Sequence, residues 1–240
     1  MFFNKKVHFG PWIDPELGLS LSEVASSCIS DPPQWHKQLA PYNSMAGEFN
    51  KPSELIAAFP KLADTRTLNT PNSNMKTCYG MSELFKRSFL IKFPCDVMVY
   101  TSSDGRIIFK SMEFVSAEHH NASIELINKD LVHMKVVINQ IMFCSDTKVD
   151  MFFCDNYYYK PQPFKIMPGV VSFTDRFGVN LIVNMSFPKA DGRFFFKKGD
   201  PWFMMTNLND SKIVLKSFEN KPKPFTRKKI ISSFFHEINK

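Results

Sequence analysis

Short apolar runs separated by turn residues dominate the chain from residue 75 onward. The runs are rich in Val, Ile, Phe and Met, and Pro, Gly, Asn, Asp or Ser separates one run from the next. This pattern predicts a mainly β fold with a sandwich or barrel-like core, because alternating α/β units would need long helical segments between strands. The predicted strands span residues 89–93, 97–100, 107–109, 132–143, 149–154, 164–173, 179–187, 194–196, 202–205 and 213–218.

Turn chemistry predicts how some of these strands connect. Ser103-Asp104-Gly105 is a strong hairpin signal, and Ser145-Asp146-Thr147 is a second one between two long apolar runs. Pro94-Cys95-Asp96 is expected to join the runs on either side of it in the same way. We therefore expect the flanking strands to pair across these turns.

The first 74 residues have a different pattern, with polar loops and short helical segments. Ser20, with Glu23 three residues later, predicts a capped helix over residues 21–29. Asp31-Pro32-Pro33 precedes a second helix, through Leu39. Two more helices are predicted over 52–59 and 75–87. The chain is thus predicted to have a loop-rich N-terminal wrap with short helices (1–74), a β-rich core (75–220) and a basic C-terminal tail with an amphipathic helix (221–240).

The tail carries most of the excess positive charge. Six Lys or Arg residues and one Glu give residues 221–240 a net charge of +5, out of +7 for the whole chain. After the Pro222-Lys223-Pro224 linker, apolar residues recur every four positions, which predicts the helix. A helix this short needs a groove, on its own domain or on a neighbouring subunit; contact with a membrane surface or a nucleic acid is the alternative. The residues assigned to assembly are Arg227, Lys228, Lys229, Ile230, Phe234 and Phe235.

Composition narrows the chemistry further. The chain has 25 Phe and 13 Met, which fits either an AT-rich genome or a core of large, adaptable side chains. Its 5 cysteines lack metal-ligand spacing, so we expect reduced core thiols and predict neither a metal nor another cofactor.

Other polar and aromatic clusters have simpler explanations than chemistry. Neighbours on a strand point to opposite faces, so Glu118-His119-His120 is a poor metal site. Asp146, Asp150 and Asp155 fit solvated turns, and Tyr157-Tyr158-Tyr159 fits a sheet edge or an interface better than a nucleotide-stacking site. The sequence has no P-loop, dinucleotide fingerprint or nucleophile elbow, so no catalytic residue is assigned.

Two glycine turns in the second half of the chain carry a resemblance. Pro168-Gly169-Val170-Val171 precedes one apolar strand, and Lys197-Lys198-Gly199-Asp200 precedes another. These motifs resemble the late half of the dUTPase and dCTP-deaminase core, a β-clip of short strands. The resemblance implies a ligand-binding turn made by Gly169, Ser172, Asp175 and Gly199. Ser172 stands where that family has the carboxylate that activates water, and a serine cannot act as that base near neutral pH, so the reaction is not expected to be shared.

Two earlier motifs extend the likeness over most of the chain. Pro33-Gln34-Trp35 and the segment 75–81, Met-Lys-Thr-Cys-Tyr-Gly-Met, precede the same glycine turns. Together they resemble an uncharacterised family of tailed-phage and bacterial proteins. The resemblance implies a non-enzymatic phage accessory protein, an oligomeric virion component associated with the capsid, neck or tail, with other virion proteins as partners.

Two other functions remain open on the sequence. One is a nucleotide-binding enzyme or sensor derived from the dUTPase-like fold, with Asp175 as a carboxylate near the turn. The other is a host-modifying protein that binds nucleic acid through its tail. The sequence has no signal peptide and no transmembrane segment, so we expect a soluble protein in the host cytoplasm during infection, or in the virion.

Overall fold

The computed structural model describes residues 6–38, 79–111, 115–119, 129–156, 158–159, 161–174 and 177–224. The chain divides into two compact units. Cys28–Lys86 forms the smaller one, and Met1–Ser27 together with Arg87–Lys240 forms the larger one. All of the described strands belong to the larger unit.

The largest sheet of this unit has seven strands in the order β14-β1-β7-β11-β15, with β6 added to β7 and β9 added to β11. Its strands are β1 (Lys6–Ile13), β6 (Val115–His119), β7 (Leu131–Ser145), β9 (Lys165–Ile166), β11 (Phe177–Pro188), β14 (Lys212–Leu215) and β15 (Lys223–Pro224). Most neighbours are antiparallel, but β14 runs parallel to β1, and β15 runs parallel to β11.

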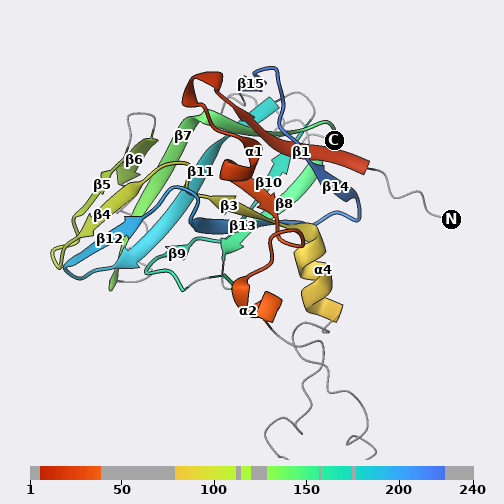
Figure 1. The fold of residues 1–240 in the computed structure, drawn as a ribbon. Coiled ribbons are helices and arrows are strands. Elements are labelled where there is room, and N and C mark those ends of the chain that lie inside the picture. Colours follow the sequence, from red (N-terminus) through yellow and green to blue (C-terminus); the bar gives the residue numbers. More distant parts are fainter. Residues whose placement is uncertain are drawn as a thin grey trace, which may run out of the picture. The chain divides into compact units, whose positions relative to one another are not determined.

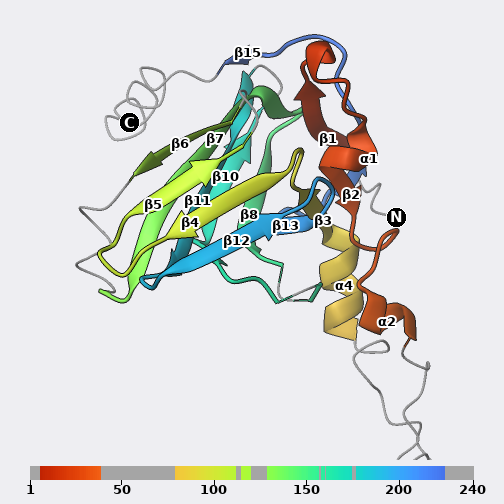
Figure 2. The same ribbon diagram turned by 60° about the vertical axis from the view of Figure 1, so that its left-hand side comes forward.

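Two smaller sheets complete the unit. The five-stranded sheet has the order β10-β8-β13-β3-β2, and the three-stranded sheet has the order β12-β4-β5. Their strands are β2 (Ala25–Ser27), β3 (Ser88–Lys92), β4 (Val97–Thr101), β5 (Ile107–Lys110), β8 (Val149–Asp155), β10 (Gly169–Phe173), β12 (Gly192–Phe196) and β13 (Pro201–Asn207). The curled sheets form a half-barrel (Figures 1 and 2). The prediction of a mainly β fold is therefore confirmed.

Phenylalanine rings fill the space enclosed by the sheets. Phe93 lies between two other rings, with centroids 4.8 Å from both Phe196 and Trp202. A second group surrounds Phe9, whose ring centroid lies 5.6 Å from that of Phe143. All of these side chains are at most 4% exposed. Many of the phenylalanine side chains thus belong to a core of large side chains. This agrees with one of the two explanations offered for the high phenylalanine content.

The helix predicted at residues 21–29 is shorter than expected. Ser20 and Glu23 form the predicted capping box, but α1 spans only Leu21–Val24, after a 3₁₀ turn at Pro15–Leu17. The chain then becomes extended at Ala25, which pairs with Ile91 of β3. Pairing with a buried strand outweighs helix propensity here, since tertiary contacts routinely override it.

The Glu23 carboxylate links the capping box to the β12–β13 turn. The ammonium group of Lys198 lies 2.7 Å from Glu23 Oε1, and the Ser20 N–H donates a 2.7 Å hydrogen bond to Oε2. These two interactions, the one with Lys198 first, lower the pKa of Glu23 from 4.5 to about 2. Because the folded-state pKa is depressed, the stabilisation is complete above the unfolded pKa and disappears as the pH falls toward 2.

We expect the Glu23 side chain to titrate near pH 2 in an NMR experiment that follows its carboxyl carbon. Lys198→Met removes the nearest cation, so the pKa should move up toward 4.5, whereas Lys197→Met is the matched control and should leave it unchanged. A pKa of 4.5 in the unaltered chain would show that the contact with Lys198 does not form in solution.

The smaller unit contains two described helices. α2 (Gln34–Gln38) follows Asp31-Pro32-Pro33 as predicted, and α4 (Tyr79–Arg87) forms the later part of the helix predicted at 75–87. Within the unit, the rings of His36 and Phe85 meet edge to face at 5.3 Å. The helix predicted at 52–59 lies outside the described residues.

The expectation that the N-terminal segment consists of loops and short helices is wrong for its first described residues. Residues 6–13 were expected to form loops, but they form β1, which lies between β7 and β14 in the largest sheet. Gly10-Pro11 indicates a turn in sequence. In the structure, the β14 ladder ends opposite Phe9, two residues before Pro11. Proline has no N–H to donate, but no carbonyl of β14 lies opposite Pro11, so no hydrogen bond of that ladder is lost.

Two of the three predicted hairpins are also wrong. β3 and β4 lie in different sheets, and so do β7 and β8, so these connections carry the chain between sheets instead of reversing it within one. Phe93 and Cys95 are buried between the sheets, which explains why the first connection cannot lie on the surface as a simple turn. The strand predicted at 164–173 divides into β9 and β10 at Met167-Pro168, because proline cannot continue a hydrogen-bonded ladder.

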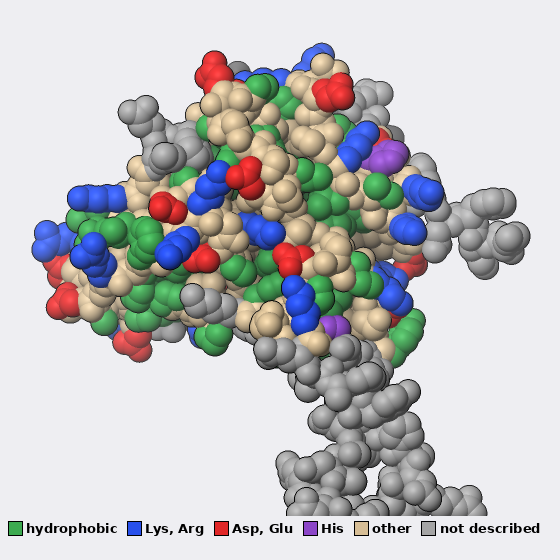
Figure 3. Space-filling view, viewed as in Figure 1, with side chains coloured by type: hydrophobic (Ala, Val, Ile, Leu, Met, Phe, Trp, Pro, Cys, Tyr) green, Lys and Arg blue, Asp and Glu red, His purple; other side chains and the backbone are tan. Residues whose placement is uncertain are grey.

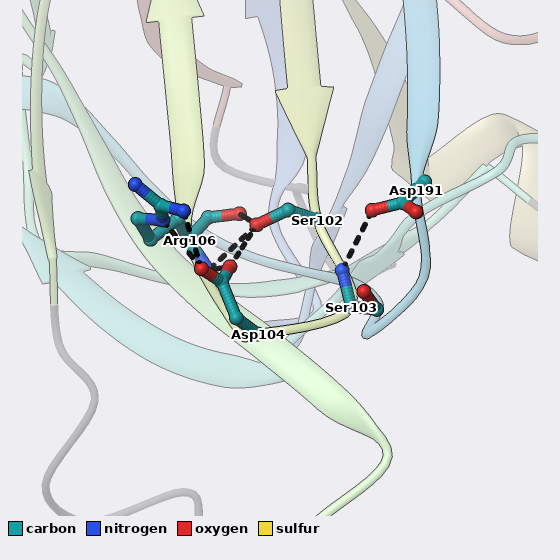
Figure 4. Close-up of polar contacts among 5 residues, drawn as sticks. All are labelled: Ser102, Ser103, Asp104, Arg106 and Asp191. Carbon is teal, nitrogen blue, oxygen red and sulfur yellow. Dashed lines mark hydrogen bonds and ion pairs between the residues drawn. The ribbon is translucent and has the colours of Figure 1, made fainter.

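The hairpin between β4 and β5 forms as predicted. Gly105 has a φ of 87°, which suits glycine. The Asp104 carboxylate accepts hydrogen bonds from Arg106, 2.6 Å from Nε and 3.2 Å from the backbone N–H, and the Arg106 guanidinium holds the pKa of Asp104 below its ordinary value. The Ser103 N–H donates to Asp191 at 2.9 Å, so the turn is attached to the β11–β12 connection (Figure 4).

A strap formed by residues 216–222 connects β14, at one edge of the largest sheet, to β15 at the other. The Lys216 N–H donates to the Phe9 carbonyl at 3.0 Å, and Phe218 packs on the buried Trp12. At the far end of the strap, Pro222 packs closely against Gly178. A Cβ added to Gly178 would lie 2.4 Å from the Pro222 ring. Lys223 and Pro224 therefore form a strand of the sheet, where the sequence predicted a linker.

Candidate functional site

A pocket of about 400 Å³ lies where the two larger sheets separate. One side is formed by the Ile166–Val171 segment, which leaves β9 and enters β10, and the other by Val179–Asn184 of β11. Phe143 and Phe153 contribute aromatic side chains from β7 and β8. None of the described residues that line the pocket has an ionisable side chain, so the lining favours an apolar occupant.

The pocket coincides with a seam in the half-barrel, defined here as the gap between β10 and the Val179–Asn184 segment of β11. On the edge away from β7, β11 pairs with β15 at Phe177–Gly178 and with β9 at Met185–Ser186. Between these two ladders, the described part of the chain supplies no strand. β10 likewise has β8 as its only named neighbour among the described strands. At the Met185 end of this segment, the Asn184 carbonyl accepts a 3.0 Å hydrogen bond from the Met167 N–H. From Val179 to Val183, and along β10, no described strand pairs with the edge that borders the pocket.

The structure separates the residues of the predicted ligand turn. Gly169 begins β10 and lines the pocket, so the turn does lead directly into a sheet, as predicted. Ser172 lies outside the lining, and its hydroxyl donates to Asp150 on the neighbouring strand. Gly199 belongs to a different turn, before β13, where its φ is 87° and its N–H donates to the Phe93 carbonyl at 2.8 Å. Asp175 lies outside the described residues.

Each member of the acidic series has a structural partner. Asp146 accepts from His8 Nδ1 at 2.8 Å, Asp150 accepts from Ser172, and Asp155 accepts from the Ile166 N–H. These contacts join separate strands, so the aspartates do more than occupy solvated turns. Among the described residues, no group of His, Cys, Asp and Glu side chains could hold a metal ion.

The structure describes only some of the other residues that the sequence suggested as candidates. Cys28, Cys95 and Cys144 are buried and Cys154 is half-buried, and none of these four forms a disulfide, in agreement with the prediction of reduced core thiols. Cys78 lies outside the described residues. Burial raises the pKa of both Cys144 and Cys154 to about 11, which makes them poor nucleophiles at neutral pH. Tyr158 and Tyr159 lie in a turn after β8, not on a strand. The side chains of His119 and His120, and the assembly residues Arg227, Lys228, Lys229, Ile230, Phe234 and Phe235, lie outside the described part.

Sequence reasoning missed a second surface, the outer face of the β12-β4-β5 sheet. Directly opposed residues share a face, and two rows cross the three strands on this side. The rows are Arg193–Tyr100–Ile108 and Phe195–Met98–Lys110. Ile108 is 55% exposed and Phe195 is 50% exposed. In Figure 3, hydrophobic side chains lie beside Lys and Arg side chains at the left, where Figure 1 places β4, β5 and β12.

Two cations flank the aromatic ring in the middle of this outer face. The Arg193 guanidinium carbon lies 5.7 Å from the centroid of the Tyr100 ring, and the Lys110 ammonium nitrogen lies 5.8 Å from it. The Tyr100 hydroxyl donates to the sulfur of Met98 on the same strand. The outer face thus has an apolar and aromatic centre with positive charge beside it. Aromatic residues, Met and Arg are the types enriched at protein interfaces.

No family model, no curated protein and no solved structure matches the chain. The resemblances to the dUTPase-like core and to the phage family therefore stay predictions from sequence. No helix in the described part of the chain is long and apolar enough to cross a membrane.

Proposed function

We propose that the protein is a non-enzymatic, oligomeric assembly protein, and that it serves as a component of a phage particle. The observation that carries the assembly role is the outer face of the β12-β4-β5 sheet, where Phe195 and Ile108 stay half exposed in the single chain. Contiguous exposed apolar side chains with charged neighbours mark interaction surfaces. A further copy of this chain or another particle protein would cover them.

The assignment to a phage particle rests on the sequence resemblance alone. Its test is mass spectrometry of purified particles, in which we expect stoichiometric copies of the chain. Particles that lack the chain would contradict this part of the proposal and leave the assembly role to be judged separately.

The alternative of nucleotide binding gains no support from the pocket. Its described lining offers no Lys or Arg for a phosphate group, and Ser172 and Gly199 of the predicted ligand turn lie outside it. A thermal-shift screen with nucleotides, with and without Mg²⁺, should therefore leave the melting temperature unchanged. A large shift would favour this alternative, because a ligand at a hundredfold excess over its Kd stabilises by about 2.7 kcal/mol.

We expect the double substitution Ile108→Ser, Phe195→Ser to weaken self-association roughly tenfold or more. Truncating an aromatic residue at the centre of an interface costs on the order of 2 kcal/mol, which exceeds a factor of ten in the dissociation constant. Size-exclusion chromatography with light scattering would show a lower mass at equal concentration.

Leu208→Ser is the matched control, because Leu208 is 52% exposed and lies outside both rows of the outer face. The control should keep the unaltered mass, and circular dichroism should show that all variants are folded. An oligomer that survives the double substitution would contradict the assignment of this face.

A further inference from the structure

The two sides of the seam belong to one hairpin that is paired at both of its ends. Near the turn, Thr174 pairs with Phe177, and at the far end Ile166 pairs with Met185. The number of residues between these two pairs is the same on both strands, so the pairs share one register. The seam is therefore an opening inside a hairpin, closed at either end.

The middle of this hairpin is held apart because each side pairs with a different strand. All five residues of Gly169–Phe173 pair with β8, in the five-stranded sheet. The opposite segment, Val179–Val183, pairs with β7 in the largest sheet. Two ladders thus fix the two sides of the pocket, so its shape does not depend on an occupant. A largely preformed cavity is usual for a small-molecule site.

The buried part of the lining is apolar. Its buried members are Phe143, Ile166, Phe173, Leu181 and Val183. Met167 is 39% exposed and Val170 is 58% exposed, so apolar side chains of the lining also face water. Covering them with an apolar group is favourable. An ionised group would lose hydration here without gaining an opposite charge, since no described lining residue is ionisable.

The size of the opening favours a small molecule over a polypeptide. Five residues of a strand, such as Val179–Val183, span roughly 13 Å. A partner strand added to this edge would have to end within that length, because the hairpin is paired at both ends. A single aliphatic chain fits an elongated apolar space of about 400 Å³. The amides of Asn180 and Asn184, the polar residues of the described lining, suit a neutral hydroxyl or carbonyl group.

We infer that the seam pocket binds a neutral amphipathic molecule with one aliphatic chain. The chain lies between β10 and β11, and its hydroxyl or carbonyl group lies beside Asn180 or Asn184. This site is additional to the proposed assembly role and does not depend on the outer face of the β12-β4-β5 sheet.

Fluorescence titration of the full-length chain with N-phenyl-naphthylamine, a neutral dye that brightens in apolar surroundings, tests the site. We expect saturable binding of one dye molecule per chain. Decanol should displace the dye at a roughly tenfold lower concentration than decanoate, which has a chain of the same length but carries a charge.

Gly169→Phe should fill the pocket and weaken dye binding at least roughly tenfold. Position 169 lies on the same face of β10 as Val171 and Phe173, and a Cβ there would meet no atom within 4 Å. The melting temperature should therefore not fall. Ser172→Phe is the matched control, because it adds the same ring on the opposite face of the strand, outside the lining, and should leave dye binding unchanged.

Ile182→Lys tests the charge preference without filling the pocket. It places a cation at a half-buried position of the lining, so decanoate should gain affinity relative to decanol. Val214→Lys is the control at a half-buried residue of β14, outside the lining, and should keep the preference for decanol.

Three results would overturn the inference. One is the absence of saturable dye binding by the folded full-length chain, which would mean that the pocket is filled by protein. Another is dye binding that Gly169→Phe leaves unchanged, or a preference for decanol that Ile182→Lys leaves unchanged. The third is loss of dye binding in the Ile108→Ser, Phe195→Ser variant, which would place the dye on the outer face. Because that variant tests assembly by its mass, failure of the assembly face is distinguishable from failure of this site.

Discussion

Replacing Phe93 with alanine is expected to lower the free energy of unfolding by about 3–5 kcal/mol. The ring is 1% exposed and stacks on both Phe196 and Trp202, so its removal leaves a cavity that these neighbours cannot fill from either side. Phe93 also connects the end of β3 to the β12–β13 turn, since its N–H donates to the Asp200 carbonyl and its carbonyl accepts from the Gly199 N–H. The melting temperature should fall by roughly 6–20 °C.

Urea unfolding followed by circular dichroism measures this effect. Leu208→Ala is the control at an exposed apolar residue, and it should change the free energy of unfolding by less than about 0.5 kcal/mol. A loss below about 1 kcal/mol for Phe93→Ala would mean that the aromatic stack is not the centre of the core.

Gly10→Ala should destabilise the fold by about 1–3 kcal/mol, because a Cβ at this position would lie 2.0 Å from the carbonyl oxygen of Lys216. The clash is with backbone, so relief requires moving the strap away from β1 and weakening the hydrogen bond from the Lys216 N–H to Phe9. The strap also covers Trp12, which would gain exposure to water.

The comparison for this substitution is Gly169→Ala, where a Cβ would meet no atom within 4 Å. The control should be neutral within about 0.5 kcal/mol in the same denaturant titration. Equal effects at the two glycines would show that the strap does not hold its position against β1.

The strands of this fold were largely predictable, because a period of two in apolar residues follows from the geometry of any half-buried strand. Their partners were not. Turn residues such as Ser145-Asp146-Thr147 show that the chain changes direction, but β7 and β8 continue into different sheets, and that depends on distant strands. β1 was not predicted, and a Gly-Pro pair such as Gly10-Pro11 is more typical of a turn than of a strand. The end of the β14 ladder at Phe9 explains why a proline is tolerated there.

The two candidate surfaces differ in how far the sequence reveals them. The pocket combines two segments of the chain with Phe143 and Phe153, and no local pattern places those rings beside Gly169. The outer face of the β12-β4-β5 sheet did leave a signal. Phe194-Phe195-Phe196 fills three successive positions of a strand with phenylalanine, so one ring must point away from the core, and Phe195 does.

Hydroxyl-radical footprinting of the full-length chain, at concentrations where it is dissociated and where it is associated, tests the assembly role most directly. We predict that Met98, Tyr100 and Phe195 lose reactivity on association, since these side chains share the outer face of one sheet. Tyr79, which is 77% exposed and lies in the smaller unit, should keep its reactivity. A chain that stays monomeric, or associates while these three side chains remain fully reactive, would contradict the proposed function.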